Sequence, residues 1–262
     1  MSVHALQNSA PEMGLRVLVL GGNSAIAVAA ARLYAAESAR IVLAGRDATR
    51  LETVAQDLRL RGAAAAIVET CDLSEEASAS RLGVMSKHFG GFDHVLLAYG
   101  VLGEQHLAQE HEAETARILK VNLVSAAQWA NAVAALLEAQ GQGSLVVIGS
   151  VAGDRGKRSN YVYGASKAGL EVLVQGIAHR FAGRPRASQG PRVALVKPGP
   201  TDTPMTAGMN KAGPLWSGPE AVARVVRAAA DRGGVAYAPA RWRLLMLLLR
   251  SLPRPVWNRL DI

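Results

Sequence analysis

The chain alternates short runs of valine, isoleucine and leucine with longer alanine-rich stretches along most of its length. The apolar runs do not place a polar residue at every second position, which is typical of strands buried on both faces of a parallel sheet. Strands and helices that alternate in this way predict βαβ units with right-handed crossovers. We therefore predict the α/β class, with one doubly wound parallel sheet of about seven strands and helices on both faces.

The predicted strands are the short apolar runs at residues 16–20, 40–44, 66–70, 94–98, 144–148, 192–196 and 235–238. The predicted helices lie between or after them, at residues 25–37, 49–61, 75–88, 112–138, 163–181 and 219–231. No repeat and no linker divides the chain. We expect a polar N-terminal tail (1–13), one dinucleotide-binding catalytic domain (14–239) and a basic, apolar helical C-terminal tail (240–262).

The composition restricts the class of protein further. Half of the 262 residues are hydrophobic and 19% are charged, as in globular domains that bury a sizeable core. Cys71 is the single cysteine, so an intrachain disulfide is excluded. Residues 1–14 hold no apolar run of signal-peptide length, and no run of about 18 apolar residues could span a membrane. We therefore expect a cytoplasmic protein.

The formal net charge of +8 is compatible with nucleic acid, an anionic membrane or a phosphorylated substrate as partner, or simply with an arginine-rich surface. Only 5% of the residues are aromatic, and they do not interleave with the basic ones, so we expect no nucleic-acid partner. The six histidines show no metal-ligand spacing, so we expect no metal.

A glycine-containing turn, Gly21-Gly22-Asn23-Ser24-Ala25-Ile26-Ala27, follows the first predicted strand and opens directly into a helix. Such a turn lets the backbone approach a pyrophosphate at the positive end of the helix. After the second strand, Gly45 stands where NAD-binding sheets carry an acidic residue for the ribose 2′-hydroxyl. Arg46 follows, with the charge and fork geometry that suit a 2′-phosphate, so we predict NADP(H) in preference to NAD(H).

A second group of polar residues follows the later strands. Tyr163 and Lys167 are four residues apart in a predicted helix and therefore share one face. Ser150 lies 13 residues before Tyr163, at the end of a predicted strand, and Asn122 lies further upstream. A tyrosine hydroxyl can protonate the alkoxide that forms when a hydride reaches a ketone, and a nearby ammonium group lowers its pKa for that task.

In order and spacing, these residues and the turn Lys197-Pro198-Gly199-Pro200-Thr201-Asp202-Thr203 resemble the short-chain dehydrogenase/reductase family over about residues 16–238. The resemblance implies a Rossmann-type fold, hydride transfer between a ketone and an alcohol, and a homodimer or homotetramer. The implied catalytic residues are Asn122, Ser150, Tyr163 and Lys167, with Ser150 holding the carbonyl oxygen and Asn122 a water that links Lys167 to solvent. The implied cofactor-binding residues are Gly21, Asn23, Ser24, Ala25, Ile26, Arg46, Asp72, Leu73, Ala98, Gly100, Tyr163, Lys167, Pro198, Gly199, Thr201 and Thr203, the last of which would anchor the nicotinamide.

The chain departs from the family pattern at two places. Alanines occupy positions 25 and 27, where the family carries glycine, and Leu97-Ala98-Tyr99-Gly100 replaces the usual Asn-Asn-Ala-Gly. At both places the sequence does not establish which residues contact the cofactor. Asp72 matches an adenine-contacting aspartate of the family, but it could equally cap the next helix.

Within the family, the chain resembles the polyprenyl-phosphoryl-2-keto-pentose reductases of the decaprenylphosphoryl-2-keto-ribose type. The resemblance lies in residues 20–27, 151–156, 160–163, 197–199 and 203–209. It implies that the substrate is the keto group of a lipid-linked or phosphorylated sugar. A generic short-chain reductase of a small or lipid-like ketone is the alternative. We expect residues 154–160 and 204–216 to line the substrate mouth, the second as a mobile lid.

The C-terminal tail combines five arginines between positions 241 and 259 with the apolar run Leu244-Leu245-Met246-Leu247-Leu248-Leu249. A helix at 242–250 could lie in the interface of an anionic membrane, which would place the protein at the inner face of that membrane. Alternatively, its leucines pack against the domain or a sister subunit.

Two other classes of function stay open. A catalytically inactive dinucleotide-binding sensor or scaffold would explain the alanines in the phosphate turn, and a membrane-bound interaction protein would explain the tail. The complete Ser–Tyr–Lys set favours an enzyme.

Overall fold

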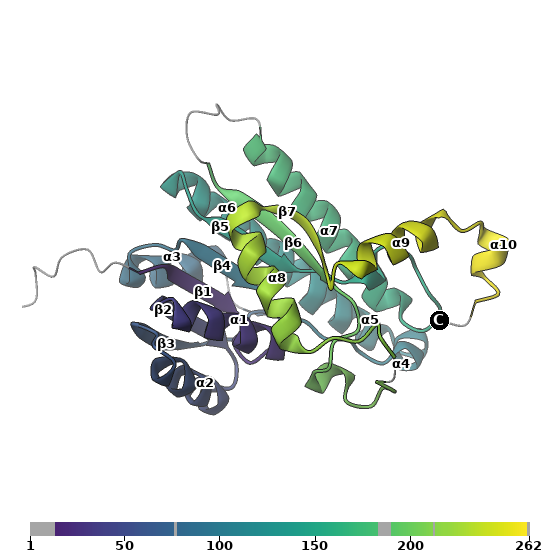
Figure 1. Ribbon diagram of the computed structural model, residues 1–262, viewed down its shortest axis with the longest axis horizontal. Helices are drawn as coiled ribbons and strands as arrows, with labels where there is room; N and C mark the ends of the chain where they lie inside the picture. Colours follow the sequence, from purple (N-terminus) through teal and green to yellow (C-terminus); the bar gives the residue numbers. More distant parts are fainter. Residues whose placement is uncertain (1–13, 76–77, 183–189, 212, 261–262) are drawn as a thin grey trace, which may run out of the picture.

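The structure is a computed structural model that describes residues 14–75, 78–182, 190–211 and 213–260. It contains one sheet of seven parallel strands between two layers of helices (Figure 1). The predicted fold class is therefore confirmed. The predicted N-terminal tail, residues 1–13, lies outside the described residues.

The sheet has the strand order β3-β2-β1-β4-β5-β6-β7. The strands are β1 (Arg16–Leu20), β2 (Arg40–Gly45), β3 (Ala65–Thr70), β4 (His94–Leu97), β5 (Ser144–Ile148), β6 (Arg192–Pro198) and β7 (Gly234–Ala238). The chain runs from β1 outwards to β3 and then returns to the other side of β1 to form β4. This reversal is the topological switch point, and ligands of such sheets bind beyond the carboxyl ends of the strands there.

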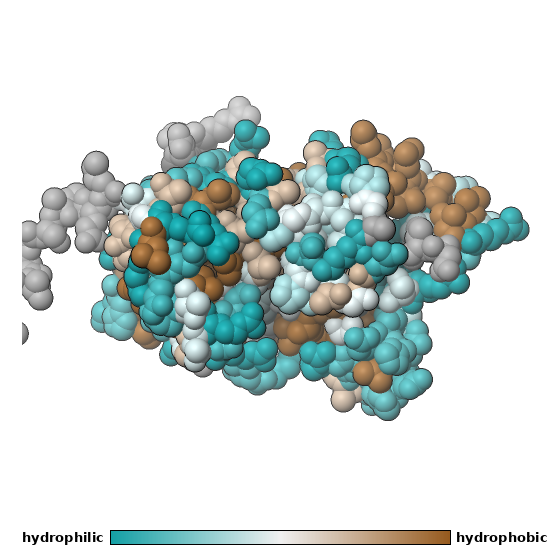
Figure 2. Space-filling view, turned by 60° about the horizontal axis from the view of Figure 1, so that its bottom comes forward, coloured by the Kyte–Doolittle hydropathy of each residue, from teal (hydrophilic) through white to brown (hydrophobic). Residues whose placement is uncertain are grey.

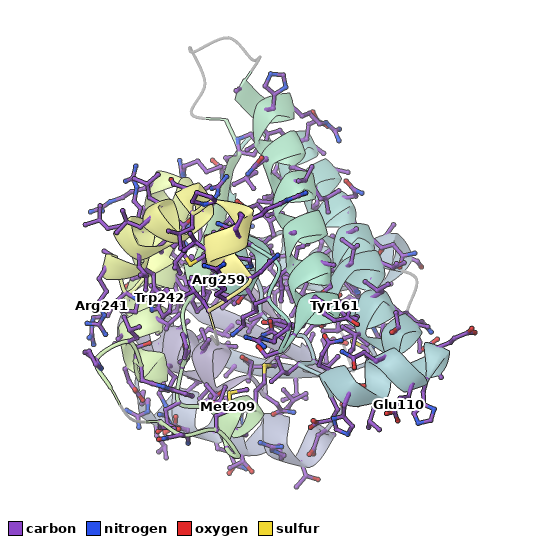
Figure 3. The ribbon with its side chains drawn as sticks, turned by 90° about the vertical axis from the view of Figure 1, so that its right-hand side faces the viewer. Glu110, Tyr161, Met209, Arg241, Trp242 and Arg259 are labelled. Atoms are coloured by element: carbon purple, nitrogen blue, oxygen red, sulfur yellow. The ribbon has the colours of Figure 1, made fainter. Side chains whose placement is uncertain are left out.

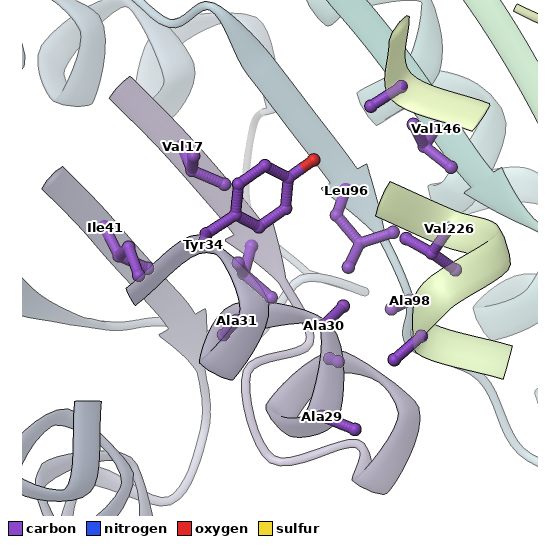
Figure 4. Packing of buried hydrophobic residues seen from close by; sticks show 14 of the residues in the cluster. Val17, Ala29, Ala30, Ala31, Tyr34, Ile41, Leu96, Ala98, Val146 and Val226 are labelled. Carbon is purple, nitrogen blue, oxygen red and sulfur yellow. The ribbon is translucent and has the colours of Figure 1, made fainter. Parts of the chain in front are cut away.

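Helices α1 (Ala25–Ala36), α2 (Ala48–Leu60) and α8 (Pro219–Arg232) cover one face of the sheet, and α3 (Ser78–Phe89), α6 (Ala126–Gln140) and α7 (Tyr161–Ala182) cover the other. The alanines of α1 let it lie close to the sheet: Ala30 and Ala31 are fully buried, beside Val17 and Ile41 (Figure 4). Each face thus has its own apolar core, which fixes the strand ends from which the site is built.

One predicted helix has a different geometry. Residues 112–138, predicted as a single α-helix, form α5 (Glu112–Leu119), a π-helical turn η1 (Lys120–Ser125) and α6. A π turn inserts one extra residue per turn, which the 3.6-residue period of the apolar side chains does not reveal. The short helix α4 (Gln105–Glu110) was not predicted.

Most other boundaries differ from the predictions by one to three residues. In the described residues α3 begins at Ser78 instead of residue 75, α7 begins at Tyr161 instead of 163, and β4 ends at Leu97 before Ala98. Differences of this size are usual at helix ends.

The C-terminal tail folds as α9 (Arg241–Ser251) and α10 (Arg254–Trp257). Trp242 and Met246 on α9 are buried, whereas Leu244, Leu247 and Leu248 are 64–69% exposed. In Figure 2, apolar side chains gather at the right-hand end of the molecule, where Figure 1 has these two helices. The tail thus packs on the domain through one face and presents an apolar face outwards. None of the helices in the described residues is long and apolar enough to cross a membrane.

Candidate active site

A cavity of about 1090 Å³ lies beyond the carboxyl ends of the strands at the switch point. It brings together nearly all the residues that the sequence singled out. Those that line it are Gly21, Asn23, Ser24, Ala25, Ile26, Arg46, Asp72, Leu73, Ala98, Gly100, Ser150, Tyr163, Lys167, Pro198, Gly199, Thr201 and Thr203. Asn122 is the predicted site residue that does not line it.

The phosphate turn has the backbone that its glycines predict. Gly21 has a φ of +97°, and a Cβ there would come within 2.8 Å of the Tyr99 backbone nitrogen. The methyl group of Ala27 is fully buried in the core beneath the turn, so it takes no space from a phosphate. Ala25 does line the cavity, at the first turn of α1.

Two polar side chains of this turn have hydrogen-bonding capacity to spare. The Oδ1 atom of Asn23 is buried without a hydrogen-bond partner, and Ser24 occupies the N-cap position of α1 without a side-chain capping bond. A nucleotide can supply both needs, because its ribose hydroxyls donate hydrogen bonds and its phosphates accept them. The turn therefore fits a dinucleotide.

The end of β2 carries positive charge, as predicted. Arg46 is 75% exposed and lies 3.7 Å from the carboxylate of Asp72. Asp47 caps α2 by accepting a hydrogen bond from the backbone of Arg50 at 3.0 Å. Arg50 itself also lines the cavity, and the sequence analysis missed it. The available signal was its position in the first turn of the helix that follows Arg46.

Asp72 closes the turn after β3. It accepts hydrogen bonds from the backbone nitrogen and the hydroxyl of Ser74 at 2.9 and 2.7 Å. Burial tends to raise the pKa of Asp72, but the bonds from Ser74 and the charge of Arg46 outweigh it and leave the pKa lowered. The carboxylate is thus ionised at the adenosine end of the cavity.

Tyr99 accounts for the unusual sequence Leu97-Ala98-Tyr99-Gly100 after β4. Its ring packs into the core on the α3 side, its hydroxyl lies 3.0 Å from the Ser125 Oγ, and its backbone lies against Gly21. Gly100 follows, where an added Cβ would lie 3.0 Å from the Asn122 Oδ1 and 3.5 Å from the Lys167 Nζ. The tyrosine fills the space beside the turn, and the glycine keeps the chain close to Asn122 and Lys167.

Ser150, Tyr163 and Lys167 meet at the centre of the cavity wall. Ser150 ends the segment after β5, and Tyr163 and Lys167 lie one turn apart on α7. The Ser150 and Tyr163 side chains are hydrogen-bonded. Lys167 is buried, its Nζ donates to the Ile148 carbonyl at 3.1 Å, and it lies 5.9 Å from the centre of the Tyr163 ring.

The protonation of this group differs from the expectation. Burial raises the pKa of Tyr163, and the hydrogen bond to Ser150 offsets this only in part. Burial lowers the pKa of Lys167 to about 8. We expected the ammonium group to lower the pKa of Tyr163, but the Nζ points to the Ile148 carbonyl instead. The tyrosine is therefore protonated at neutral pH, as a proton donor must be.

The side chain of Asn122 is bound within the protein, and the water predicted at this residue stays a prediction. Asn122 lies in η1 and is buried; its Nδ2 donates to the Val101 carbonyl and to Ser166 Oγ, at 2.7 and 3.2 Å. Its Oδ1 accepts from the Val101 nitrogen at 2.8 Å. Both amide hydrogens are used within the protein. The side chain thus fixes the loop after Gly100, and does not contact the cavity.

The two expected mouth segments contribute unequally. Lys157 and Asn160 from the first and Pro204, Met205, Thr206 and Met209 from the second line the cavity. Asp154, expected at the mouth, is instead buried in an ion cluster with Lys197 and Glu171, and accepts a hydrogen bond from Tyr237 at 2.9 Å. Burial lowers the pKa of Lys197, but the two carboxylates outweigh it and leave the pKa raised.

The tail contacts both mouth segments. At the start of α9, Trp242 donates to the Leu215 carbonyl at 3.2 Å, and a Cβ on Gly199 would lie 1.9 Å from its Nε1. At the other end, Arg155 donates to the carbonyls of Leu249 and Leu252, and its guanidinium lies 4.3 Å from the centre of the Trp257 ring. Figure 3 views this end of the molecule, with Trp242 labelled on α9, Tyr161 on α7 and Met209 on the loop between β6 and α8.

In the described part of the chain, no three histidine, cysteine, aspartate or glutamate side chains gather as a metal site would require. The site has three parts: the phosphate turn with the neighbouring strand ends, the group Ser150, Tyr163 and Lys167, and the mouth beside the tail.

Comparison with known proteins identifies the family. The model of the family "short chain dehydrogenase" matches residues 16–213. An uncharacterised oxidoreductase of Streptomyces coelicolor is 36% identical over 94% of this chain and 96% of its own length. An uncharacterised oxidoreductase of Mycobacterium tuberculosis is 37% identical over 93% of this chain and 96% of its own length. A short-chain dehydrogenase from Sphingobium yanoikuyae, solved with NADPH, has a TM-score of 0.76 at 25% identity and covers 92% of this chain and 97% of its own. The chain belongs to the short-chain dehydrogenase/reductase family and is an NAD(P)-dependent oxidoreductase.

Proposed function

We propose that the protein reduces a ketone with NADPH through Ser150, Tyr163 and Lys167. The observation that carries this proposal is the convergence of these three side chains on the cavity that the phosphate turn also lines. NADPH, when bound, supplies the hydride. Ser150 donates a hydrogen bond that holds the carbonyl oxygen, and Tyr163 delivers its proton to that oxygen as negative charge develops there.

Lys167 assists the proton transfer without giving a proton to the substrate itself. It is an ammonium group below about pH 8, and one of its three hydrogens is used on the Ile148 carbonyl. The other two are free for a cofactor ribose or for water that returns a proton to Tyr163.

The preference for NADPH over NADH rests on the end of β2. Arg46 and Arg50 both line the cavity there, and Gly45 stands in place of the acidic residue that bonds a ribose 2′-hydroxyl in NAD-binding sheets. Two guanidinium groups suit a 2′-phosphate by charge and by geometry. The NADPH bound to the Sphingobium protein is consistent with this choice.

The proposed substrate is the keto group of a lipid-linked or phosphorylated sugar, taken up at the inner face of a membrane. The outward face of α9 supports the membrane contact: Leu244, Leu247 and Leu248 share one side, and Arg243 and Arg250 lie beside them. Such a helix can insert its leucines among acyl chains while its arginines meet anionic headgroups. Reduction of a small soluble ketone is the alternative.

Sedimentation with anionic vesicles tests the membrane contact. The wild type should bind at low salt, and a variant with Leu244, Leu247 and Leu248 all changed to glutamine should stay in solution. If α9 instead packs on a sister subunit, in the homodimer or homotetramer proposed for this chain, the wild type will not bind vesicles. The triple variant will then change the sedimentation coefficient of the protein.

An inactive dinucleotide-binding sensor is the second candidate, favoured by Ala25, the alanine of the phosphate turn that lines the cavity. Titration with NADPH followed by addition of ketones separates the two. The enzyme consumes bound NADPH with some ketones of a varied panel, including lipid-like ones. A sensor binds NADPH with equal affinity and consumes none.

A further inference from the structure

Lys157 contributes to the walls of two cavities. It lines the catalytic cavity, and it also lines a smaller one of about 190 Å³ whose other walls are Arg158, Trp257, Asn258 and Leu260. The side chain is partly buried, and no carboxylate of the described residues forms an ion pair with it. Burial lowers the pKa of Lys157, because the ammonium group gives up hydration without gaining a counter-ion. An anion bound at this position would act as the missing counter-ion and offset the lost hydration of the ammonium group.

A second unsatisfied group lies beside it. The Oδ1 of Asn160 is buried without a hydrogen-bond partner, and Asn160 also lines the catalytic cavity. The amide oxygen and nitrogen exchange places by a simple flip, so the same side chain can donate to an anion. Asn160 directly precedes α7, a helix of 22 residues whose positive end therefore lies at the same place.

These groups are separate from those assigned to the cofactor. The pyrophosphate end of the cavity is formed by the turn at Gly21 and the 2′-phosphate end by Arg46, on the loops after β1 and β2. Lys157 and Asn160 come from the segment that joins Ser150 to Tyr163, next to the tail. An anion held there would belong to the substrate.

We propose that Lys157 and Asn160 form an anion subsite, and that the ketone reduced at Tyr163 carries a phosphate, phosphodiester or carboxylate group that binds them. This inference rests on the proposed ketone reduction and names its substrate class. The smaller cavity is lined by Lys157, Trp257 and Leu260, so it offers a substituent beyond the anion a place beside the tail.

The test uses two matched pairs of ketones: 2-oxopropylphosphonate with its neutral dimethyl ester, and 4-oxopentanoate with its neutral methyl ester. The ratio of kcat/KM for the charged member to that for the neutral member is measured with NADPH. The wild type should favour the charged member of at least one pair by about 10–100-fold, the range of a hydrogen bond to a charged group. The pair with the larger ratio shows whether the subsite prefers a phosphate-like group or a carboxylate.

Lys157→Met should bring the ratio close to one, and Lys157→Arg should keep most of it. Lys87→Met removes the same charge from an exposed position on α3 and should leave the ratio as in the wild type. A wild-type ratio near one, or a ratio that Lys157→Met leaves unchanged, would overturn the proposal.

A binding measurement separates this inference from the proposed reaction. Phenylphosphonate is titrated into the NADPH-loaded protein by calorimetry, with the wild type and with Lys157→Met. Binding at least about tenfold tighter in the wild type, with no ketone of either pair reduced, would uphold the subsite and refute the proposed reaction on these ketones. Equal binding by the two proteins would refute the subsite whatever the activity.

Discussion

The cofactor end of the cavity and its substrate mouth are built in different ways. The cofactor end consists of the turns that directly follow β1 to β4, with close backbone contacts such as that of Gly21 with Tyr99. The mouth consists of two segments held by side chains from distant parts of the chain, among them Trp242 on the Leu215 carbonyl and Tyr237 on Asp154. The cofactor end follows from the fold itself, whereas the mouth depends on particular long-range contacts.

The largest effect is expected where the two regions meet. Tyr163→Phe keeps the ring and removes the proton donor, so ketone reduction should fall by about 10²–10⁴-fold, the usual contribution of general acid catalysis. NADPH binding should persist, because the phosphate turn is untouched. Tyr161→Phe is the matched control, since Tyr161 is 44% exposed on the first turn of the same helix. A Tyr163→Phe enzyme that keeps more than about a tenth of the wild-type rate would exclude Tyr163 as the acid.

The next effect concerns the ion cluster that supports the mouth. Lys197→Met leaves the carboxylates of Asp154 and Glu171 together without their cation, in a site where Lys197 and Asp154 are each 1% exposed. Loss of one partner from a buried pair costs about 3–5 kcal/mol, so the free energy of unfolding in urea should fall by that amount. Lys211→Met breaks an exposed pair with Asp202 and should cost about 1 kcal/mol or less. Equal losses in the two variants would refute a structural role for the cluster.

A smaller effect is expected at the cofactor end. Arg46→Ala should weaken NADPH binding by about 10–150-fold and leave NADH binding nearly unchanged, because NADH has no 2′-phosphate. Arg61→Ala, which removes an arginine just beyond α2, should change neither. Tighter binding of NADH than NADPH by the wild type would contradict the proposed preference.

The smallest effect is the dependence of the rate on pH. The pKa of Lys167 is lowered to about 8, so Lys167 is charged below that pH and neutral above it. Since the ammonium form is the one proposed to donate to the cofactor ribose or to the water that returns a proton to Tyr163, kcat/KM for ketone reduction should be level below about pH 8 and fall above it, by at most tenfold per pH unit. A profile that stays level to about pH 10 would show that the Lys167 charge is not needed.

The same contrast explains how much the sequence predicts. The residues after the strands are brought together because parallel strands end at one edge, so 17 of the 18 predicted site residues line the cavity. Asn122 is the exception: its side chain bonds Val101, on the loop after β4, and no spacing in the sequence indicates that contact. The burial of Asp154 required Lys197 from β6, Glu171 from α7 and Tyr237 from β7. No spacing in the sequence predicts that these residues meet.

The central claim is that this cavity transfers a hydride from NADPH to a ketone and a proton from Tyr163 to its oxygen. The most direct measurement uses NADPH deuterated at both C4 positions of the nicotinamide, a ketone from the varied panel, and mass spectrometry of the product. We expect an alcohol with one deuterium on the carbinol carbon, formed by the wild type and nearly absent with Tyr163→Phe. NADPH that binds tightly while no ketone gains deuterium would contradict it.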